Sequence, residues 1–205
     1  RNNVYKVKDF EAAFAKYLGL SYAHAVTSGT AALKVALKAL KVGPGDEVIT
    51  QTHTFVATVE AILECGATAV VTDVDWTLNM DPEDLARKIT SRTKVIIPVH
   101  MFGVAARMDE IMAVARKRGI AVLEDTAQAC GGTYRGKPLG TIGDVGTFSF
   151  DHGKLLTTGE GGMVVTNNES LYRAARIYAD HGHEDNPAFP LGEDTRSFPG
   201  FNYRM

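Results

Sequence analysis

Short apolar runs and longer stretches with helical spacing follow one another along most of this chain. Apolar residues at three- and four-residue intervals predict a first helix over Val7–Leu18, which Gly19 ends. The same patterns predict strands and helices in turn at Tyr22–Val26, Ala31–Leu40, Glu47–Thr50, Val56–Cys65, Thr68–Asp73, Pro82–Lys88, Lys94–Val99, Met108–Arg118 and Ile120–Glu124. This alternation indicates crossover connections, and therefore an α/β fold with a mainly parallel sheet and helices on both faces.

The pattern changes after Asp125. A glycine-rich stretch, Gly131–Asp144, has the character of a loop. Two strands and a helix are predicted next, at Val145–Phe150, Met163–Thr166 and Glu169–Ala179. The stretch Asp180–Gly200 is polar, rich in Pro and Gly and without periodicity, so it is predicted to be a long loop. Long loops in compact domains are often functional.

Composition restricts the class of protein. The 205 residues are 45% hydrophobic and 22% charged, with a formal net charge of -2, which is typical of a globular chain with one sizeable core. The slight acidity argues against a nucleic-acid or anionic-membrane partner. Cys65 and Cys130 belong to no metal-spaced set and are expected to be reduced thiols. No signal-peptide pattern and no apolar run of membrane length occurs, so we expect a cytoplasmic protein.

Lys154 is the residue that first indicates chemistry. It lies between two predicted apolar strands and is followed by Leu155 and Leu156. A lysine held inside a protein loses solvation, so its pKa falls and its neutral amine becomes a nucleophile that can form a Schiff base. An exposed loop lysine is the more common alternative, and Lys154 alone does not decide between the two.

Two other features favour the chemical interpretation. Asp125 follows the apolar run Ile120–Glu124, at the carboxyl end of a strand, where ligands of α/β sheets gather. Ser28, Gly29 and Thr30 open a strongly helical segment, whose free N–H groups and positive dipole end suit a phosphate. An amine, a carboxylate and a phosphate cradle are what a protein supplies to hold pyridoxal 5'-phosphate (PLP).

Seven motifs occur in order along the chain: SGTAAL (Ser28–Leu33), GPGDEVI (Gly43–Ile49), THTFVAT (Thr52–Thr58), EDTAQA (Glu124–Ala129), GDVGTFSF (Gly143–Phe150), K-LLTTGEGG (Lys154–Gly162) and NYRM (Asn202–Met205). In these motifs and their spacing the chain resembles the PLP-dependent sugar aminotransferases of the DegT/StrS type, which have the fold of aspartate aminotransferase. The resemblance runs from one end of the chain to the other.

The resemblance implies a domain organisation. Residues 1–205 are expected to form the large cofactor-binding domain of a PLP-dependent transferase of fold type I. Family members are nearly twice as long, so the small C-terminal domain of the family is expected to be absent from this chain. Asn202 matches a residue that the family supplies from the neighbouring subunit, which implies an obligate homodimer with a shared active site.

The resemblance also implies a role for each matching residue. Lys154 is expected to form the internal aldimine and then to shuttle a proton between the donor's α-carbon and the cofactor. Asp125 is expected to pair with the pyridine nitrogen and keep its proton in place. The other matches are cofactor contacts: Gly29, Thr30 and Ser149 at the phosphate, Phe55 stacked on the ring, Gln128 near the ring's 3-hydroxyl, and Asn202 from the partner subunit.

The implied reaction is the conversion of a keto sugar, usually nucleotide-linked, to an amino sugar with glutamate or glutamine as amino donor. Such a reaction belongs to the biosynthesis of amino sugars and polysaccharides. Cys130 stands where many members have His, and Asp151–Gly153 replaces a more usual His-Pro-Thr type of segment. These loops line the substrate side in the family, so the identity of the sugar stays open.

Two alternatives remain. A sugar dehydratase of the same fold carries His at the lysine position, and His152 is close to that position. A non-catalytic regulatory protein that kept the fold is the second, although intact Lys154, Asp125 and Gln128 argue against it.

The chain contains no G-x-G-x-x-G leading from a strand into a helix and no phosphate-binding loop of the G-x-x-x-x-G-K-[ST] type. No metal site is predicted, because neither the Asp73–Asp75 nor the His181–His183 pair has further ligands spaced to complete one.

Overall fold

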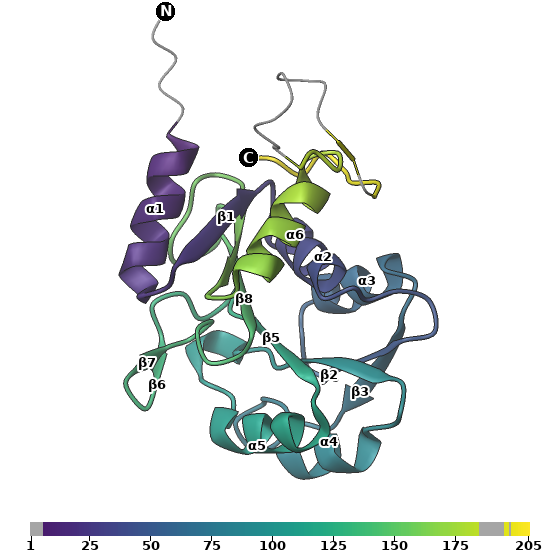
Figure 1. Ribbon diagram of the computed structural model, residues 1–205. Helices are drawn as coiled ribbons and strands as arrows, with labels where there is room; N and C mark the ends of the chain where they lie inside the picture. The colour runs from purple at the N-terminus through teal and green to yellow at the C-terminus, as the bar shows by residue number, and fades with distance from the viewer. Residues whose placement is uncertain (1–5, 185–194, 197) are drawn as a thin grey trace, which may run out of the picture.

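The computed structural model describes residues 6–184, 195–196 and 198–205 (Figure 1). Seven strands form one sheet in the order β1-β9-β8-β5-β4-β2-β3. Their bounds are β1 Tyr22–Val26, β2 Glu47–Gln51, β3 Thr68–Thr72, β4 Thr93–Ile97, β5 Ala121–Asp125, β8 Val145–Ser149 and β9 Gly162–Thr166. Neighbouring strands are parallel from β3 to β8, whereas β9 is antiparallel to both β8 and β1. The predicted mainly parallel sheet is confirmed.

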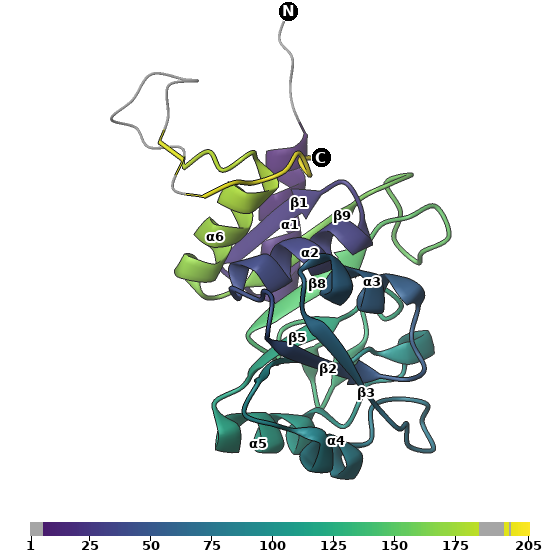
Figure 2. The same ribbon diagram turned by 90° about the vertical axis from the view of Figure 1, so that its right-hand side faces the viewer.

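Helices cover both faces of this sheet, as predicted. The α-helices of the described residues are α1 Val7–Leu18, α2 Gly29–Ala39, α3 Val56–Glu64, α4 Pro82–Lys88, α5 Met108–Arg118 and α6 Glu169–Ala179. Helices α2, α3 and α6 pack on one face, and α4 and α5 pack on the other. Figure 2 shows α2 and α3 side by side above strands β2 and β3, with α4 and α5 together below these strands. Helix α1 covers β1, β8 and β9.

The strand sequences explain why both faces are covered. Val48 of β2 packs in the cluster under α2 and α3, whereas the next residue, Ile49, packs in the cluster under α4 and α5. Val122 and Leu123 of β5 divide between the same two clusters. Successive side chains of a strand point to opposite faces, so a strand that is apolar at consecutive positions needs a helix layer on each side.

Helix α2 lies at the centre of its layer and is apolar almost all round. Its half-buried Lys34 forms an ion pair with Glu64 at 2.5 Å and lies over the rings of Phe201 and Tyr203. Burial alone would lower the pKa of Lys34, but the hydrogen bonds to Glu64 and Tyr203 outweigh that effect and raise it. The lysine thus joins α2, α3 and the C-terminal segment of the chain.

One stretch differs from the prediction. The predicted loop Gly131–Asp144 contains a short hairpin, β6 Thr133–Tyr134 paired with β7 Lys137–Pro138. The two connecting residues, Arg135 and Gly136, both have positive φ, at 48° and 79°. A two-residue hairpin loop of this kind needs two such residues in succession, and arginine rarely supplies one. Only Gly136 therefore carried a turn signal in the sequence, and the hairpin was not predicted.

Smaller differences concern element ends. Helix α2 begins at Gly29 instead of Ala31, and β4 ends at Ile97, before the predicted Val99. Most of the predicted loop Asp180–Gly200 lies outside the described residues. Among the helices that the structure describes, none has the length and apolarity needed to cross a membrane. The assignment of residues 1–205 to the large domain stays a prediction.

Candidate active site

A cavity of about 340 Å³ opens where β5 and β8 end, beside the first turn of α2. Strands β5 and β8 are parallel, so their carboxyl ends lie at the same edge of the sheet. Seven of the eight residues that the sequence indicates line this cavity: Gly29, Thr30, Phe55, Asp125, Gln128, Ser149 and Lys154. The eighth, Asn202, lies elsewhere. The sequence motifs therefore converge on one place, although they are far apart along the chain.

Asp125, the last residue of β5, is almost completely buried, with 4% of its surface exposed. One carboxylate oxygen accepts a hydrogen bond from Thr58 Oγ1 at 2.9 Å, and the other accepts one from the Ala127 N–H at 3.1 Å. Burial raises the pKa of Asp125, while the hydrogen bonds from Ala127 and Thr58 act in the opposite direction. The carboxylate is held in one orientation and faces the cavity.

Thr58 ends the THTFVAT motif, but the sequence indicated no role for it. It is fully buried on α3, and its hydroxyl lies 2.8 Å from that of Thr54 as well as donating to Asp125. A hydroxyl on a buried helix face requires a polar partner. Thr58 is a polar residue among Val56, Ala57 and Val59 in a largely apolar helix. Its need for a buried partner was the one sign in the sequence of a role in the site.

The first turn of α2 forms another wall of the cavity. Ser28 caps the helix by accepting a hydrogen bond from the Ala31 N–H at 3.0 Å, and Ala32 donates the first intrahelical bond to the Ser28 carbonyl. The N–H groups of Gly29 and Thr30 precede that bond at the positive end of the helix dipole. A Cβ on Gly29 would lie 2.7 Å from Ser149 Cβ, so the helix and β8 approach each other at a distance that only glycine permits.

Lys154 lines the cavity without being enclosed by the core. It is half-buried, in the loop between β8 and β9, and its backbone N–H donates to the Asp151 carbonyl at 2.9 Å. Leu155 and Leu156, which suggested an interior position, are 84% and 42% exposed. Of the two environments that the sequence left open for Lys154, the structure gives an intermediate one, a half-buried side chain in a largely exposed loop. The positive charge of Lys154 still favours the ionised form of Asp125.

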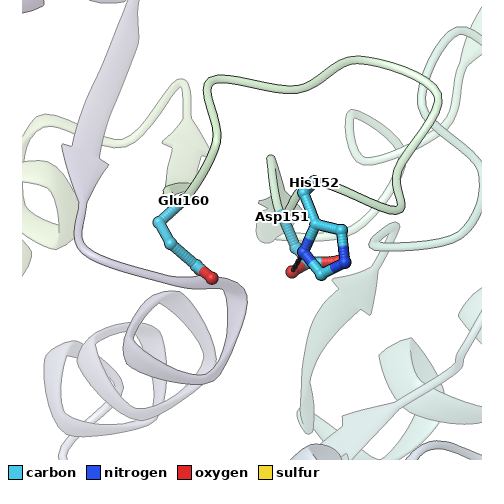
Figure 3. A group of neighbouring side chains, drawn as sticks. All are labelled: Asp151, His152 and Glu160. Atoms are coloured by element: carbon cyan, nitrogen blue, oxygen red, sulfur yellow. Dashed lines mark ion pairs between the residues drawn. The ribbon is translucent and has the colours of Figure 1, made fainter.

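Three ionisable side chains lie at the mouth of the cavity. Asp151 and His152 form an ion pair at 2.9 Å, and Glu160 extends from the other end of the same loop (Figure 3). Their ligand atoms lie within 4.8 Å of one another. His152 and Glu160 are exposed and Asp151 is half-buried. Exposed groups of this kind are common without a metal, so the arrangement alone does not define a metal site.

Gln128 and Phe55 complete the lining. The amide oxygen of Gln128 accepts a hydrogen bond from the Phe102 N–H at 3.2 Å. Phe55 precedes α3 and exposes 65% of its surface at the cavity. An aromatic side chain so exposed beside a cavity offers a face on which a ring can stack. Its stacking role stays a prediction.

Asn202 is not brought to the cavity by this chain. It is exposed and pairs with Asp180 through a backbone bridge near the end of α6. Arg204, for which the sequence indicated no role, forms an ion pair with Asp180 at 3.1 Å. A role of Asn202 in the site of a second subunit stays a prediction.

The cavity fits the cofactor that the resemblance implies. Each carboxylate oxygen of Asp125 accepts one hydrogen bond and keeps a second acceptor position. The N–H groups at the start of α2 suit a phosphate, and Lys154 supplies an amine at the same cavity. These are the three groups that PLP requires of a protein.

Known proteins resemble this chain over nearly all of its length. It is 46% identical over 202 residues to GDP-perosamine synthase of Caulobacter vibrioides, covering 97% of this chain and 53% of that protein. The X-ray structure of an aminotransferase from Psychrobacter cryohalolentis superimposes with a TM-score of 0.93 at 43% identity, over 98% of this chain and 52% of that one. The chain spans about half the length of the curated relatives it matches.

A third protein was solved with a bound cofactor. The structure of Ntda from Bacillus subtilis, with bound PMP, has a TM-score of 0.89 and 33% identity, and covers 98% of this chain and 45% of that one. The model of the DegT/DnrJ/EryC1/StrS aminotransferase family matches residues 2–205. This chain therefore belongs to the DegT/DnrJ/EryC1/StrS aminotransferase family.

Proposed function

We propose that this chain provides the cofactor-binding domain of a PLP-dependent aminotransferase that converts a keto sugar to an amino sugar. The observation that carries the proposal is the convergence of Lys154, Asp125 and the first turn of α2 on one cavity. The Caulobacter relative is named for a GDP-linked amino sugar, which supports a nucleotide-linked substrate. Glutamate or glutamine is the proposed amino donor.

Each cavity wall has a part in holding the cofactor. The N–H groups of Gly29 and Thr30, with the Ser149 hydroxyl, are suited to the phosphate, since all three lie at the positive end of α2. Phe55 offers a ring face, and Gln128 offers an amide. Asp125 is suited to a protonated ring nitrogen, because its carboxylate is buried and held by two donors.

The protein's own groups move the protons. When bound, the cofactor supplies an electron-withdrawing ring that stabilises negative charge on the carbon that loses its proton. Asp125 holds the proton on the ring nitrogen, which that stabilisation requires. The Lys154 amine lies at the cavity, half-exposed, where its Nζ can take a proton from the α-carbon of the amino donor and return it.

The geometry does not favour the dehydratase alternative. Lys154 lines the cavity, whereas His152 is exposed, with its side chain paired to Asp151 at the mouth. Lys154 is therefore available as a base in the cavity, whereas the His152 side chain is paired with the Asp151 carboxylate. This supports amino transfer as the reaction of the site.

We further propose a cytoplasmic homodimer in which the partner completes the site. Support comes from exposed apolar side chains in the segments that line the cavity. Phe55 lines it and exposes 65% of its surface, and the residues that follow the lining residues Phe55 and Lys154 in the chain, Val56 and Leu155, expose 55% and 84%. Exposed large apolar side chains beside a binding cavity are typical of an association surface. Asn202, which lies away from the cavity of its own chain, is the residue proposed to reach the partner's site. Light scattering on the purified protein measures the mass.

The test is the visible absorbance of the purified protein with PLP. A band of bound cofactor that bleaches on addition of glutamate is expected for the wild-type protein and for a Lys137→Ala control in the exposed hairpin. Lys154→Ala should lose the bleaching and several orders of magnitude in turnover. A band unmoved by glutamate in the wild-type protein would favour the dehydratase, and no band at all would favour the regulatory alternative.

A further inference from the structure

A buried hydrogen bond between a histidine and a glutamate lies behind the cavity, and neither residue lines it. His100, which follows β4, and Glu124, in β5, both have 0% exposed side chains, and His100 Nε2 lies 3.0 Å from Glu124 Oε2. Glu124 precedes Asp125 in the strand, so the two carboxylates point to opposite faces of the sheet. The pair therefore cannot touch a ligand of the cavity directly.

Glu124 is surrounded by donors. Besides His100, its oxygens accept hydrogen bonds from the N–H groups of Gly140, Ile142 and Gly143, at 2.9, 2.6 and 2.7 Å. A carboxylate can accept from four donors, whereas a carboxylic acid would bring a hydrogen of its own. The buried charge of Glu124 is thus satisfied on every side.

The second nitrogen of His100 identifies the proton position. His100 Nδ1 lies 3.1 Å from the Ala106 N–H. A backbone N–H can only donate, so Nδ1 accepts and the ring proton resides on Nε2, where it is donated to Glu124. The imidazole therefore links a carboxylate in the core to the backbone of the loop that runs from Met101 to Ala106.

That loop reaches the cavity through Phe102. The Phe102 N–H donates to the Gln128 amide oxygen at 3.2 Å, and the backbone at Phe102 is held at φ 52°, a left-handed conformation that persists only where neighbouring contacts enforce it. Since the atom facing a backbone N–H must be an acceptor, the oxygen of the Gln128 amide is engaged there. Its NH2 group is left for the cavity that Gln128 lines.

We propose that His100 and Glu124 are positioning residues that act on the cofactor through Gln128. The chain of contacts is Glu124 to the His100 ring, His100 to the Ala106 N–H, and the 101–106 loop to the Gln128 amide. It keeps the NH2 group of Gln128 turned into the cavity, as a donor to an oxygen on the bound ring. The inference rests on the proposed function, because it requires PLP in this cavity.

The test is a double-mutant cycle on PLP affinity, measured by equilibrium dialysis. His100→Gln keeps a donor for Glu124 but offers no acceptor in the Nδ1 position, so the loop is released. We expect the dissociation constant of PLP to rise about fivefold, the effect of one hydrogen bond. In a Gln128→Ala background the same substitution should change it by less than about twofold, because residues that act through one contact are non-additive.

Two further variants separate positioning from a general loss of stability. His100→Asn places an amide oxygen in the Nδ1 position and should bring the dissociation constant back toward the wild-type value. Ile111→Val, a buried change in α5 on the same face of the sheet, should lower the urea midpoint without changing PLP affinity. If His100→Gln does not fold, Glu124→Gln replaces it, and its effect on PLP affinity is again measured with and without Gln128.

The outcomes are distinguishable. Equal effects of His100→Gln with and without Gln128, or no effect at all on PLP affinity, would overturn the positioning role. Failure of the wild-type protein to bind PLP would overturn the proposed function instead. A loss of affinity in His100→Gln that disappears in the Gln128→Ala background supports the inference.

Discussion

Gly29→Ala tests how closely α2 must approach β8 at the cavity. A methyl group at this position would lie 2.7 Å from Ser149 Cβ and 3.1 Å from Ser149 Oγ. Carbon atoms in contact normally lie about 3.5–4.0 Å apart, so the overlap is roughly 1 Å. The nearer atom, Ser149 Cβ, is fixed by the backbone of the strand end and cannot rotate away. Either the helix start or the end of β8 must shift.

The expected cost follows from two opposing terms. An overpacked site of this kind costs about 1–3 kcal/mol. Alanine has a better helix propensity than glycine by up to about 1 kcal/mol, and by less in the first turn. The variant should therefore lose about 1–2 kcal/mol of unfolding free energy. For a chain of this length that corresponds to a decrease of roughly 2–8 °C in the thermal midpoint.

Gly43→Ala is the matched control. No heavy atom lies within 4 Å of the position that its Cβ would take, and its φ lies outside the left-handed region. The same chemical change there should be neutral or stabilising by up to about 1 kcal/mol, through the lower entropy of the unfolded chain. Both variants are compared by urea denaturation and by PLP dissociation constant. Gly29→Ala should also weaken PLP binding, because the shifted turn carries the N–H groups of the phosphate site.

A second substitution makes the reasoning refutable. Ser149→Gly removes the side chain that the new methyl group meets, so it should restore much of the stability of Gly29→Ala. It should not restore PLP affinity, because the Ser149 hydroxyl is lost. If Gly29→Ala matches Gly43→Ala in both measurements, the close approach has no energetic meaning. If Ser149→Gly fails to rescue stability, the clash has been assigned to the wrong pair.

Two predictions concern the carboxylate of Asp125. Burial raises its folded-state pKa above the unfolded value of about 3.9, so the folded protein binds more protons between the two values and loses stability as pH rises through them. Without cofactor, Asp125→Asn should therefore be more stable than the wild-type protein at pH 7 in urea denaturation, and this difference in stability should disappear below about pH 4. The variant should also lose the bleaching by glutamate. A stability difference that does not change with pH would contradict a raised pKa of Asp125. Thr58→Val removes a donor to a buried charge and should cost about 1.5–3 kcal/mol at pH 7, and a smaller loss at pH 3, where Asp125 is closer to protonation, would confirm the cause.

The sequence predicted the elements of the fold well because their signals are local. The spacing within Val7–Leu18 or the apolar run before Asp125 needs no knowledge of what packs against it. Contacts between distant residues carry no such signal: Thr58 bonds Asp125 across 67 residues, and His100 bonds Glu124 across 24. Each looks like an ordinary residue within its own segment, and only the folded chain gives it a partner.

Lys154 shows a different limit. Leu155 and Leu156 made its surroundings look like a core, yet both are exposed. Apolar residues in a loop are consistent with two environments, the interior of the chain and a surface that another chain covers. The local sequence pattern cannot distinguish these two environments, because apolar side chains are favourable in both. The surroundings of Lys154 could therefore not be predicted from the two leucines that follow it.

Strand β5 explains why the cavity can hold a buried carboxylate at all. Its two last residues are both acidic and both nearly inaccessible, and each charge costs free energy to bury. Glu124 offsets that cost with four N–H donors from the scaffold, whereas Asp125 has only two donors, each on a different oxygen. The unsatisfied acceptor capacity thus lies on the side of the sheet where the cavity opens. A protonated ring nitrogen would supply the missing donor there, so the same deficit that destabilises the cofactor-free protein favours binding of the cofactor.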